Sequence, residues 1–158
     1  MFSAERLTFV LLTAQHKDIF TPLLMDNQMM RYITGYPLSL LEATERYERH
    51  LSYNLAHNDV GYYLIFHKEN LIGYTKFTPY ETDAIEIGYA ILPEYRKKGY
   101  AKESIQTMIA EAKSRLYAKA VGLCDAMNTD SINLLKYFGF TPRPDTFNPS
   151  TVILTLNL

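Results

Sequence analysis

The pattern of hydrophobic and polar positions predicts that the chain begins with a strand and continues with helices. Residues 6–12 are rich in apolar and β-favouring side chains, which is typical of a strand. Residues 17–57 mostly favour helix, with a break at residues 35–37, where a glycine and a proline stand. Ser39 is a suitable N-cap for a long helix over residues 40–57. The first third of the chain should therefore hold one strand and two or three helices.

The middle of the chain has the shorter periodicity of strands. Residues 62–66 and 71–77 are two apolar, aromatic runs, and the polar stretch between them is short enough for a hairpin. Residues 85–92 alternate large apolar side chains with Glu86, Gly88 and Ala90. We expect these three strands to pair, the first two of them antiparallel.

The last third returns to helix and strand in alternation. Residues at helical spacing form one apolar stripe after residue 100: Ala101, Ile105, Met108, Ile109, Ala112 and Leu116. Residues 120–124 are a short buried-strand pattern, parallel to residues 85–92 if the helix between them is a crossover. A brief helix over 131–138, a C-cap at Gly139 and a closing strand over 151–156 follow.

These elements predict an α+β (or α/β) fold with a mixed sheet whose antiparallel half comes first. The chain has 158 residues, of which 47% are hydrophobic, and no repeat or linker interrupts it. That length matches one ordinary domain, so we expect residues 1–158 to form a single domain with a core of its own.

Charge and cysteine content narrow the possible partners. The formal net charge of −1 gives no broad basic surface for nucleic acid or an anionic membrane. Cys124 is the only cysteine, which excludes an internal disulfide and a metal site built on several thiolates. No apolar run approaches the roughly 20 residues of a membrane span. We therefore expect a cytoplasmic protein without metal, nucleic acid or membrane partner, as a monomer or homodimer.

The clearest chemical signal lies where the strand over residues 85–92 leads into the following helix. Three cations and Gly99 stand just before that helix, in the sequence Arg96-Lys97-Lys98-Gly99-Tyr100-Ala101. A helix N-terminus has unpaired N–H groups and partial positive charge, and a glycine lets backbone approach an anion closely. The motifs G-x-G-x-x-G and G-x-x-x-x-G-K-[ST] are absent, which argues against a dinucleotide or a P-loop nucleotide. A local phosphate site for another compound is the prediction.

Two blocks of the sequence resemble the GNAT superfamily of acetyl-CoA-dependent N-acetyltransferases. Arg96, Gly99 and Ala101 match the family signature [RQ]-x-x-G-x-[GA] at a strand-to-helix junction. Asn128 and Ser131, followed by Leu134-Leu135 and Gly139-Phe140, resemble the family's second block about thirty residues later. Within the family the chain looks most like the branch of ribosomal-protein alanine N-acetyltransferases (RimJ/RimL-like), because of its Glu-Arg-Leu opening and its Gly-Tyr-Ala helix start.

The resemblance implies an acyl-CoA N-acyltransferase fold in which two parallel strands splay apart and bind CoA. It implies transfer of an acetyl group from acetyl-CoA to a primary amine, of a protein N-terminus or a small molecule, by direct attack in a ternary complex. The positions implied for CoA contact are Tyr89, Ala90, Ile91, Arg96, Lys97, Lys98, Gly99, Tyr100, Ala101, Asn128 and Ser131. Lys102 departs from the family pattern, which commonly has a hydroxyl residue there.

Glu86 and Ser131 are the candidate catalytic residues. Glu86 shares a strand face with small residues that leave room for a ligand, so its carboxylate could take the amine's proton; the alternative is a structural ion pair. Ser131 could donate to the departing sulfur, or it could cap a helix together with Asn128. Many relatives use a tyrosine where this chain has Leu135, and Tyr137 should point away from the face shared by Asn128 and Ser131.

Other residues carry weaker signals. Cys124 in an apolar strand is expected to be a small buried hydrophobe, and the four histidines show no paired metal spacing. Early tyrosines fall where the family usually walls the acceptor site: Tyr32, Tyr36, Tyr47 and Tyr53. Two alternatives remain open from the sequence, a non-catalytic acyl-CoA-binding module and a transferase of a longer acyl group.

Overall fold

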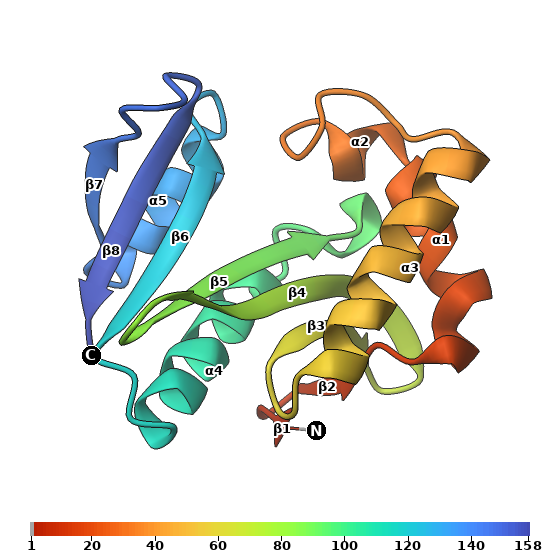
Figure 1. Cartoon of the computed structure of the whole chain (residues 1–158), viewed down its shortest axis with the longest axis horizontal. Helices are drawn as coiled ribbons and strands as arrows, with labels where there is room; N and C mark the ends of the chain where they lie inside the picture. Colours follow the sequence, from red (N-terminus) through yellow and green to blue (C-terminus); the bar gives the residue numbers. More distant parts are fainter. Residues whose placement is uncertain (1) are drawn as a thin grey trace.

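The computed structural model, which describes residues 2–158, is built on one mixed sheet of eight strands in the order β1-β2-β3-β4-β5-β6-β8-β7 (Figure 1). Neighbouring strands are antiparallel except β5 and β6. The strands are β1 (Phe2–Ser3), β2 (Leu7–Leu11), β3 (Gly61–His67), β4 (Asn70–Glu81), β5 (Ala84–Ile91), β6 (Lys119–Asp125), β7 (Thr141–Pro144) and β8 (Thr151–Asn157). The predicted single mixed sheet with an antiparallel first half is confirmed.

Helices cover both faces of the sheet, each through its own hydrophobic cluster. On one face lie α1 (Lys17–Met25), α2 (Asn27–Met30) and α3 (Leu40–Ala56), which pack on β3 and β4. On the other lie α4 (Tyr100–Ser114) and α5 (Thr129–Tyr137), which share the larger core with β2 to β6 and β8. Short 3₁₀ turns span Ala14–His16 and Pro93–Tyr95. We call these the α3 face and the α4 face.

Local sequence signals fix the helix ends as expected. Ser39 caps α3 through a capping box, in which its hydroxyl accepts from the Glu42 N–H while the Glu42 carboxylate accepts from the Ser39 N–H. After α5, Gly139 has φ of +89° and its N–H donates to the Lys136 carbonyl, which is the glycine helix end that the sequence predicted.

Three expectations about elements need correction. Leu116 does not continue the apolar stripe of α4, because the helix ends at Ser114 and Leu116, with φ of +62°, is 90% exposed. The second strand of the predicted hairpin is longer than expected, since β4 runs to Glu81 through Pro79. The edge strands β1 and β7 were not predicted: β1 has two residues and β7 contains two prolines, so neither shows a strand pattern.

The parallel pair β5 and β6 is joined over only three residue pairs, from Ala84 with Lys119 to Glu86 with Val121. Beyond that point β5 continues along β4, whereas β6 continues along β8. Figure 1 shows the two strands diverging from their shared beginning. The second half of β5 therefore has a free edge inside the sheet.

None of the helices among residues 2–158 is long and apolar enough to cross a lipid bilayer. Within the same residues, no group of three or more His, Cys, Asp or Glu side chains is placed to hold a metal ion.

Candidate active site

The loop before α4 presents backbone N–H groups without a side-chain cap. Lys97 and Gly99 have left-handed backbone angles, with φ of +59° and +84°, and Gly99 is the N-cap residue of α4. Because glycine has no side chain, nothing from this residue satisfies the first N–H groups of the helix, which lack partners within it. The first turn of α4 is thus suited to binding an anion.

Arg6, from the turn before β2, holds this loop in place. Its Nε and backbone N–H each donate to one carboxylate oxygen of Glu103 in the first turn of α4, both over 2.7 Å. Its Nη1 donates to the Lys98 carbonyl over 3.2 Å, and its guanidinium lies 4.7 Å from the centre of the Tyr100 ring. A contact that joins residues over 90 positions apart therefore shapes the loop.

The arginine of the sequence motif is turned elsewhere. Arg96 donates from Nε to the Ile91 carbonyl (2.9 Å) and from Nη2 to the Gln28 carbonyl (3.0 Å). The resemblance implies Arg96 as a CoA contact, and in this structure its side chain ties the end of β5 to α2. In this arrangement Arg96 can contribute to an anion site only indirectly, by holding the conformation of the loop.

The cations around the loop lie beside aromatic rings. Lys98 Nζ is 5.4 Å from the centre of the Tyr95 ring. Lys102 Nζ donates to the Tyr137 hydroxyl over 2.8 Å and lies 4.3 Å from the centre of its ring. As predicted, Tyr137 points away from Ser131; it is 67% exposed and lies beside the first turn of α4.

The free edge of β5 offers backbone hydrogen-bonding groups. The Leu92 N–H donates to the Ile72 carbonyl on β4, and the Gly88 carbonyl accepts from Thr75 of β4. Backbone direction alternates along a strand, so the N–H and C=O groups of Ile87, Tyr89 and Ile91 face the gap toward β6. Arg96 already occupies the Ile91 carbonyl. An extended ligand can still pair with the groups that remain, like an added strand.

Ser131 lies across this gap, in the first turn of α5. The Tyr89 hydroxyl donates to Ser131 Oγ over 3.2 Å, and Cys124 Sγ is 3.4 Å from the same oxygen. Asn128 is the N-cap of α5, accepting from the Ser131 N–H over 3.3 Å, so Ser131 itself is not the cap. Burial raises the pKa of the Cys124 thiol above its usual value, which keeps it protonated and matches the expected inert role.

Leu135, which stands where many relatives have tyrosine, is a core residue. It is 2% exposed, and its Cδ1 would lie 2.6 Å from a Cβ placed on Gly122. The Tyr89 hydroxyl instead supplies a phenol at Ser131. Strand alternation places the Tyr89 side chain with Ile87 and Ile91 on the α4 face. Its contact with Ser131 could not be predicted from the sequence, because the two residues are 42 positions apart.

Glu86 lies on the opposite, α3 face of the sheet and forms an ion pair. Its carboxylate accepts from Lys76 Nζ over 2.5 Å, and the two side chains are 12% and 32% exposed. This is the structural alternative considered for Glu86. Lys76 pairs with Gly88 in the β4–β5 register, so the ion pair flanks a position that has no side chain.

A family comparison decides the nature of this arrangement. The model of the acetyltransferase (GNAT) domain matches residues 6–141 of the chain. The chain belongs to the GNAT acetyltransferase family. The uncapped loop before α4 and the splayed β5–β6 pair are thus features of an acetyltransferase.

Solved structures of several acetyltransferases share this fold. An acetyltransferase of the GNAT family from Bacillus anthracis has a TM-score of 0.80 and 17% identity, covering 98% of this chain and 96% of its own. RimL, a ribosomal L7/L12 α-N-protein acetyltransferase in complex with coenzyme A, has a TM-score of 0.81 and 17% identity. The match covers 98% of this chain and 96% of the RimL chain. The Salmonella typhimurium acetyltransferase that modifies the N-terminal serine of L7/L12 has a TM-score of 0.80 and 17% identity. That match covers 98% of this chain and 96% of the other. No curated protein sequence matches.

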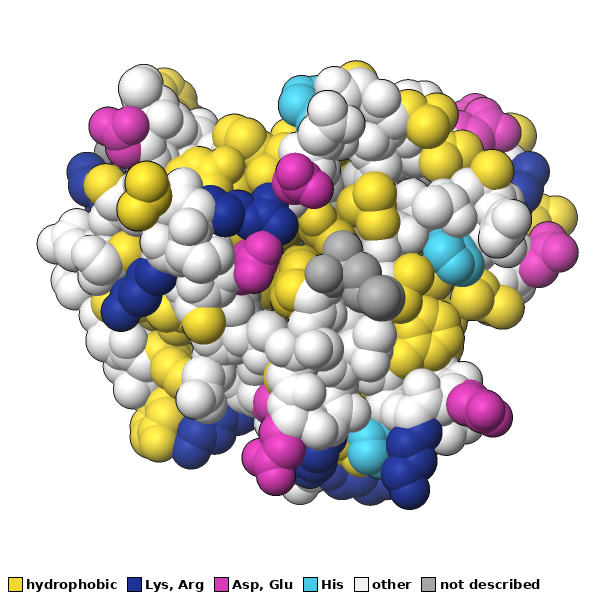
Figure 2. Space-filling model, turned by 90° about the horizontal axis from the view of Figure 1, so that it is seen from below, with side chains coloured by type: hydrophobic (Ala, Val, Ile, Leu, Met, Phe, Trp, Pro, Cys, Tyr) yellow, Lys and Arg dark blue, Asp and Glu magenta, His cyan; other side chains and the backbone are white. Residues whose placement is uncertain are grey.

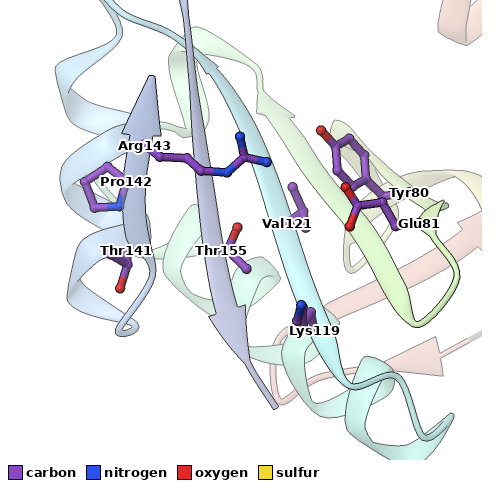
Figure 3. Close-up of a pocket in the computed structure, with 8 residues that line it drawn as sticks. All are labelled: Tyr80, Glu81, Lys119, Val121, Thr141, Pro142, Arg143 and Thr155. Carbon is purple, nitrogen blue, oxygen red and sulfur yellow. The ribbon is translucent and has the colours of Figure 1, made fainter. Parts of the chain in front are cut away.

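The α3 face of this acetyltransferase is open over its C-terminal strands. Figure 3 shows a pocket there, with a volume of about 310 Å³, between the end of β4 and strands β6, β8 and β7. The Arg143 side chain reaches across β8 toward β6, and Glu81 lies on the other side. Seen from below, the molecule is hollowed between these strands and the helices, with hydrophobic side chains lining the hollow (Figure 2).

The early tyrosines are placed differently from one another. Tyr47 is 3% exposed and donates to the Thr13 carbonyl, so it is a core residue and not part of a wall. Tyr53 stacks on His57, and the charge of Glu86 acts on its pKa, which burial chiefly raises. Tyr32 and Tyr36 are exposed near α2.

Proposed function

We propose that this protein is an acetyl-CoA-dependent N-acetyltransferase that transfers an acetyl group directly to a primary amine. The observation that carries the proposal is the free edge of β5, which is connected by one loop to the uncapped first turn of α4. The free edge of β5 offers hydrogen bonds like those of a neighbouring strand, and the first turn of α4 offers N–H groups for phosphate. CoA has two pantetheine amides and a pyrophosphate in that order.

In this proposal the pantetheine chain lies along Tyr89, Ala90 and Ile91. The pyrophosphate lies on the backbone of residues 97–101, where Lys97 and Lys98 add positive charge and Lys102 lies on the first turn. The thioester then reaches the start of the gap, where β5 and β6 separate. RimL, a protein of the same fold, has been solved with coenzyme A, which supports CoA as the ligand.

The reaction joins the two faces of the sheet. The neutral amine attacks the thioester carbonyl carbon, a C–N bond forms, and the C–S bond breaks. Glu86, on the α3 face, accepts the proton that the amine loses. The sulfur leaves as a thiolate, to which Ser131 donates a hydrogen bond, and it takes a proton from water. Because Ser131 Oγ accepts from Tyr89, its own hydrogen is available to the sulfur.

Direct attack requires no acetylated protein residue. Cys124 would be the nucleophile of the alternative route, and its burial and raised pKa make it a poor one. The amine therefore approaches from the α3 face, at Gly88, while CoA occupies the gap. Protein N-termini and small-molecule amines are both candidate acceptors.

Thiol release from acetyl-CoA, measured over a panel of peptides, amino acids and polyamines, tests the proposal. We expect release that depends on an acceptor and falls at least about 10-fold in Glu86→Gln, in line with loss of a general base. Coenzyme A binding without acceptor-dependent release would favour the acyl-CoA-binding module instead. Comparison of acetyl-CoA with longer acyl-CoA thioesters tests the chain-length alternative.

A further inference from the structure

The α3 face holds two buried nitrogen atoms that have no protein partner. Among residues 2–158, Arg46 Nε and His50 Nε2 are the buried side-chain atoms without a hydrogen bond. They are four residues apart on α3, so they lie on adjacent turns of one helix face. His50 is 7% exposed. Unpaired buried polar groups are costly, and native proteins leave few of them without a reason.

The His50 side chain lies over a strand of the sheet that holds Glu86. The His50 ring stacks on Tyr62 of β3, with centroids 3.6 Å apart, and Phe20 packs against its edge. Tyr62 pairs with Lys76 of β4, and Lys76 pairs with Gly88 of β5. These three paired residues form one row across the sheet. The row runs from Tyr62, beneath His50, to Gly88, where the proposed function places the entering amine.

Charges of both signs act on this region: the cations Arg46, Arg49 and Lys76, and the carboxylate of Glu86. Burial, together with the charges of Arg46, Arg49 and Lys76, lowers the pKa of His50 to about 3. The pKa of Tyr62 is raised chiefly by burial; the charge of Glu86 raises it as well, and the charge of Arg46 lowers it. Lys76 is the residue that forms an ion pair with Glu86. Among residues 2–158, Arg46 is partly buried and forms no salt bridge.

We propose that Arg46 and His50 bind an anionic group, a carboxylate or a phosphate, of the acceptor whose amine is acetylated at Glu86. This inference rests on the proposed function, because it assigns a substrate class to the same site. Two strand spacings separate β3 from β5, so the anionic group would lie roughly 5–10 Å from the reacting nitrogen. A free amino acid, an acidic residue near a peptide N-terminus and a phosphorylated amine all fit, whereas a polyamine does not.

Matched pairs of acceptors test the charge preference in the unmodified protein. The pairs are peptides that begin Ser-Asp and Ser-Asn, an amino acid and its amide, and phosphoethanolamine and ethanolamine. We expect a kcat/KM on the order of 10- to 100-fold higher for the anionic member of at least one pair, as for a hydrogen bond to a charged group. The pair with the largest ratio identifies the source of the anion. Equal or better use of every neutral member would overturn the inference.

Variants then assign the preference to Arg46. In Arg46→Gln we expect the anionic advantage to disappear while the neutral acceptors keep their rates, and in Arg46→Lys we expect part of it to return. Lys113→Gln removes one positive charge from an exposed position on α4 and should retain the full preference. An equal fall for both members of a pair in Arg46→Gln would contradict the assignment.

The same assay separates failure of this inference from failure of the proposed function. Acceptor-dependent thiol release without charge preference leaves the N-acetyltransferase proposal standing and removes the anion site. Absence of release with every amine, although coenzyme A binds, removes both. Thermal unfolding of Arg46→Gln supplies a folding control, and we expect no loss of stability because the variant removes an unpaired charge.

Discussion

Gly99 joins β5 to α4 in a conformation that disfavours other residues. Its φ is +84°, and a Cβ there would lie 3.2 Å from Arg6 Nη2. In Gly99→Ala we expect the free energy of unfolding to fall by about 1–2 kcal/mol. Coenzyme A should also bind more weakly, because the added carbon lies in the loop that holds the phosphate. Calorimetric titration with coenzyme A and urea unfolding measure the two effects.

Gly35 provides the matched control for this substitution. It has nearly the same φ, +85°, and open space around the position of a Cβ. Gly35→Ala should therefore cost similar stability and leave coenzyme A affinity unchanged. Equal loss of affinity in both variants would show that the Gly99 effect is general destabilisation, and unchanged affinity in Gly99→Trp would contradict the phosphate loop itself.

Ser131 and Tyr89 are in contact and have different proposed roles, which substitutions can separate. Ser131→Ala removes the group proposed to donate to the sulfur, so we expect kcat to fall on the order of 10-fold with little change in KM for acetyl-CoA. Tyr89→Phe keeps the ring and removes the hydroxyl that orients Ser131, so its loss should be smaller. Full turnover by Ser131→Ala at saturating substrates from about pH 6 to 9 would contradict the role.

Between elements, the Arg6–Glu103 ion pair connects the start of β2 to the first turn of α4. Arg6→Gln should lower stability by less than about 1 kcal/mol, because the Arg6 side chain is 40% exposed. It should weaken coenzyme A binding several-fold, since Arg6 also holds the Lys98 carbonyl. Arg115→Gln, which breaks the Arg115–Glu111 pair at the other end of α4, is the control. Loss of stability without loss of affinity would show that Arg6 does not shape the loop.

The elements themselves were largely predictable, because their signals are local. Each signal lies within a few residues of the element whose position it determines. Ser39 caps the start of α3, Gly99 and Gly139 stand at helix ends, and the alternation around Glu86 marks β5. The family resemblance placed the loop and the second block on the correct elements.

Contacts between distant segments could not be predicted in the same way. The Glu86–Lys76 pair depends on the register of β4 with β5, which Pro79 and the bulge beside it alter. The side chain of Arg96, one of the implied CoA contacts, is held by carbonyls of β5 and α2. Its partners become neighbours only when the helices of the α3 face dock on the sheet.

For the whole molecule, buried His50 links stability to pH. Its pKa is about 3 in the folded state against an ordinary value near 6.5, so the unfolded chain binds the proton more readily. Stability should therefore fall as pH drops through 6.5 and continue to fall until about pH 3. Between pH 7.5 and pH 5 we expect a loss of about 2 kcal/mol from this group.

Urea unfolding at the two pH values checks this expectation. His50→Gln should flatten the difference, whereas His57→Gln, at the exposed end of the same helix, should keep it. An unchanged pH dependence in His50→Gln would show that other groups cause it.

In the proposed function, the whole fold separates the two substrates by face. The CoA groups are expected along the gap and the first turn of α4, while Glu86, Lys76 and the open pocket of Figure 3 lie on the α3 face. The gap between β5 and β6 connects these faces. Such an arrangement lets both substrates bind together, as direct transfer requires.

The central claim is direct transfer from acetyl-CoA to an amine at this gap. The most direct test incubates the protein with acetyl-CoA and the acceptor panel, and follows thiol release together with mass spectrometry of the acceptor and the protein. The account predicts release that depends on the acceptor, an acceptor with one acetyl group on nitrogen, and an unmodified protein. Bound coenzyme A without acetylated acceptor, or an acetyl group carried by Cys124, would contradict it.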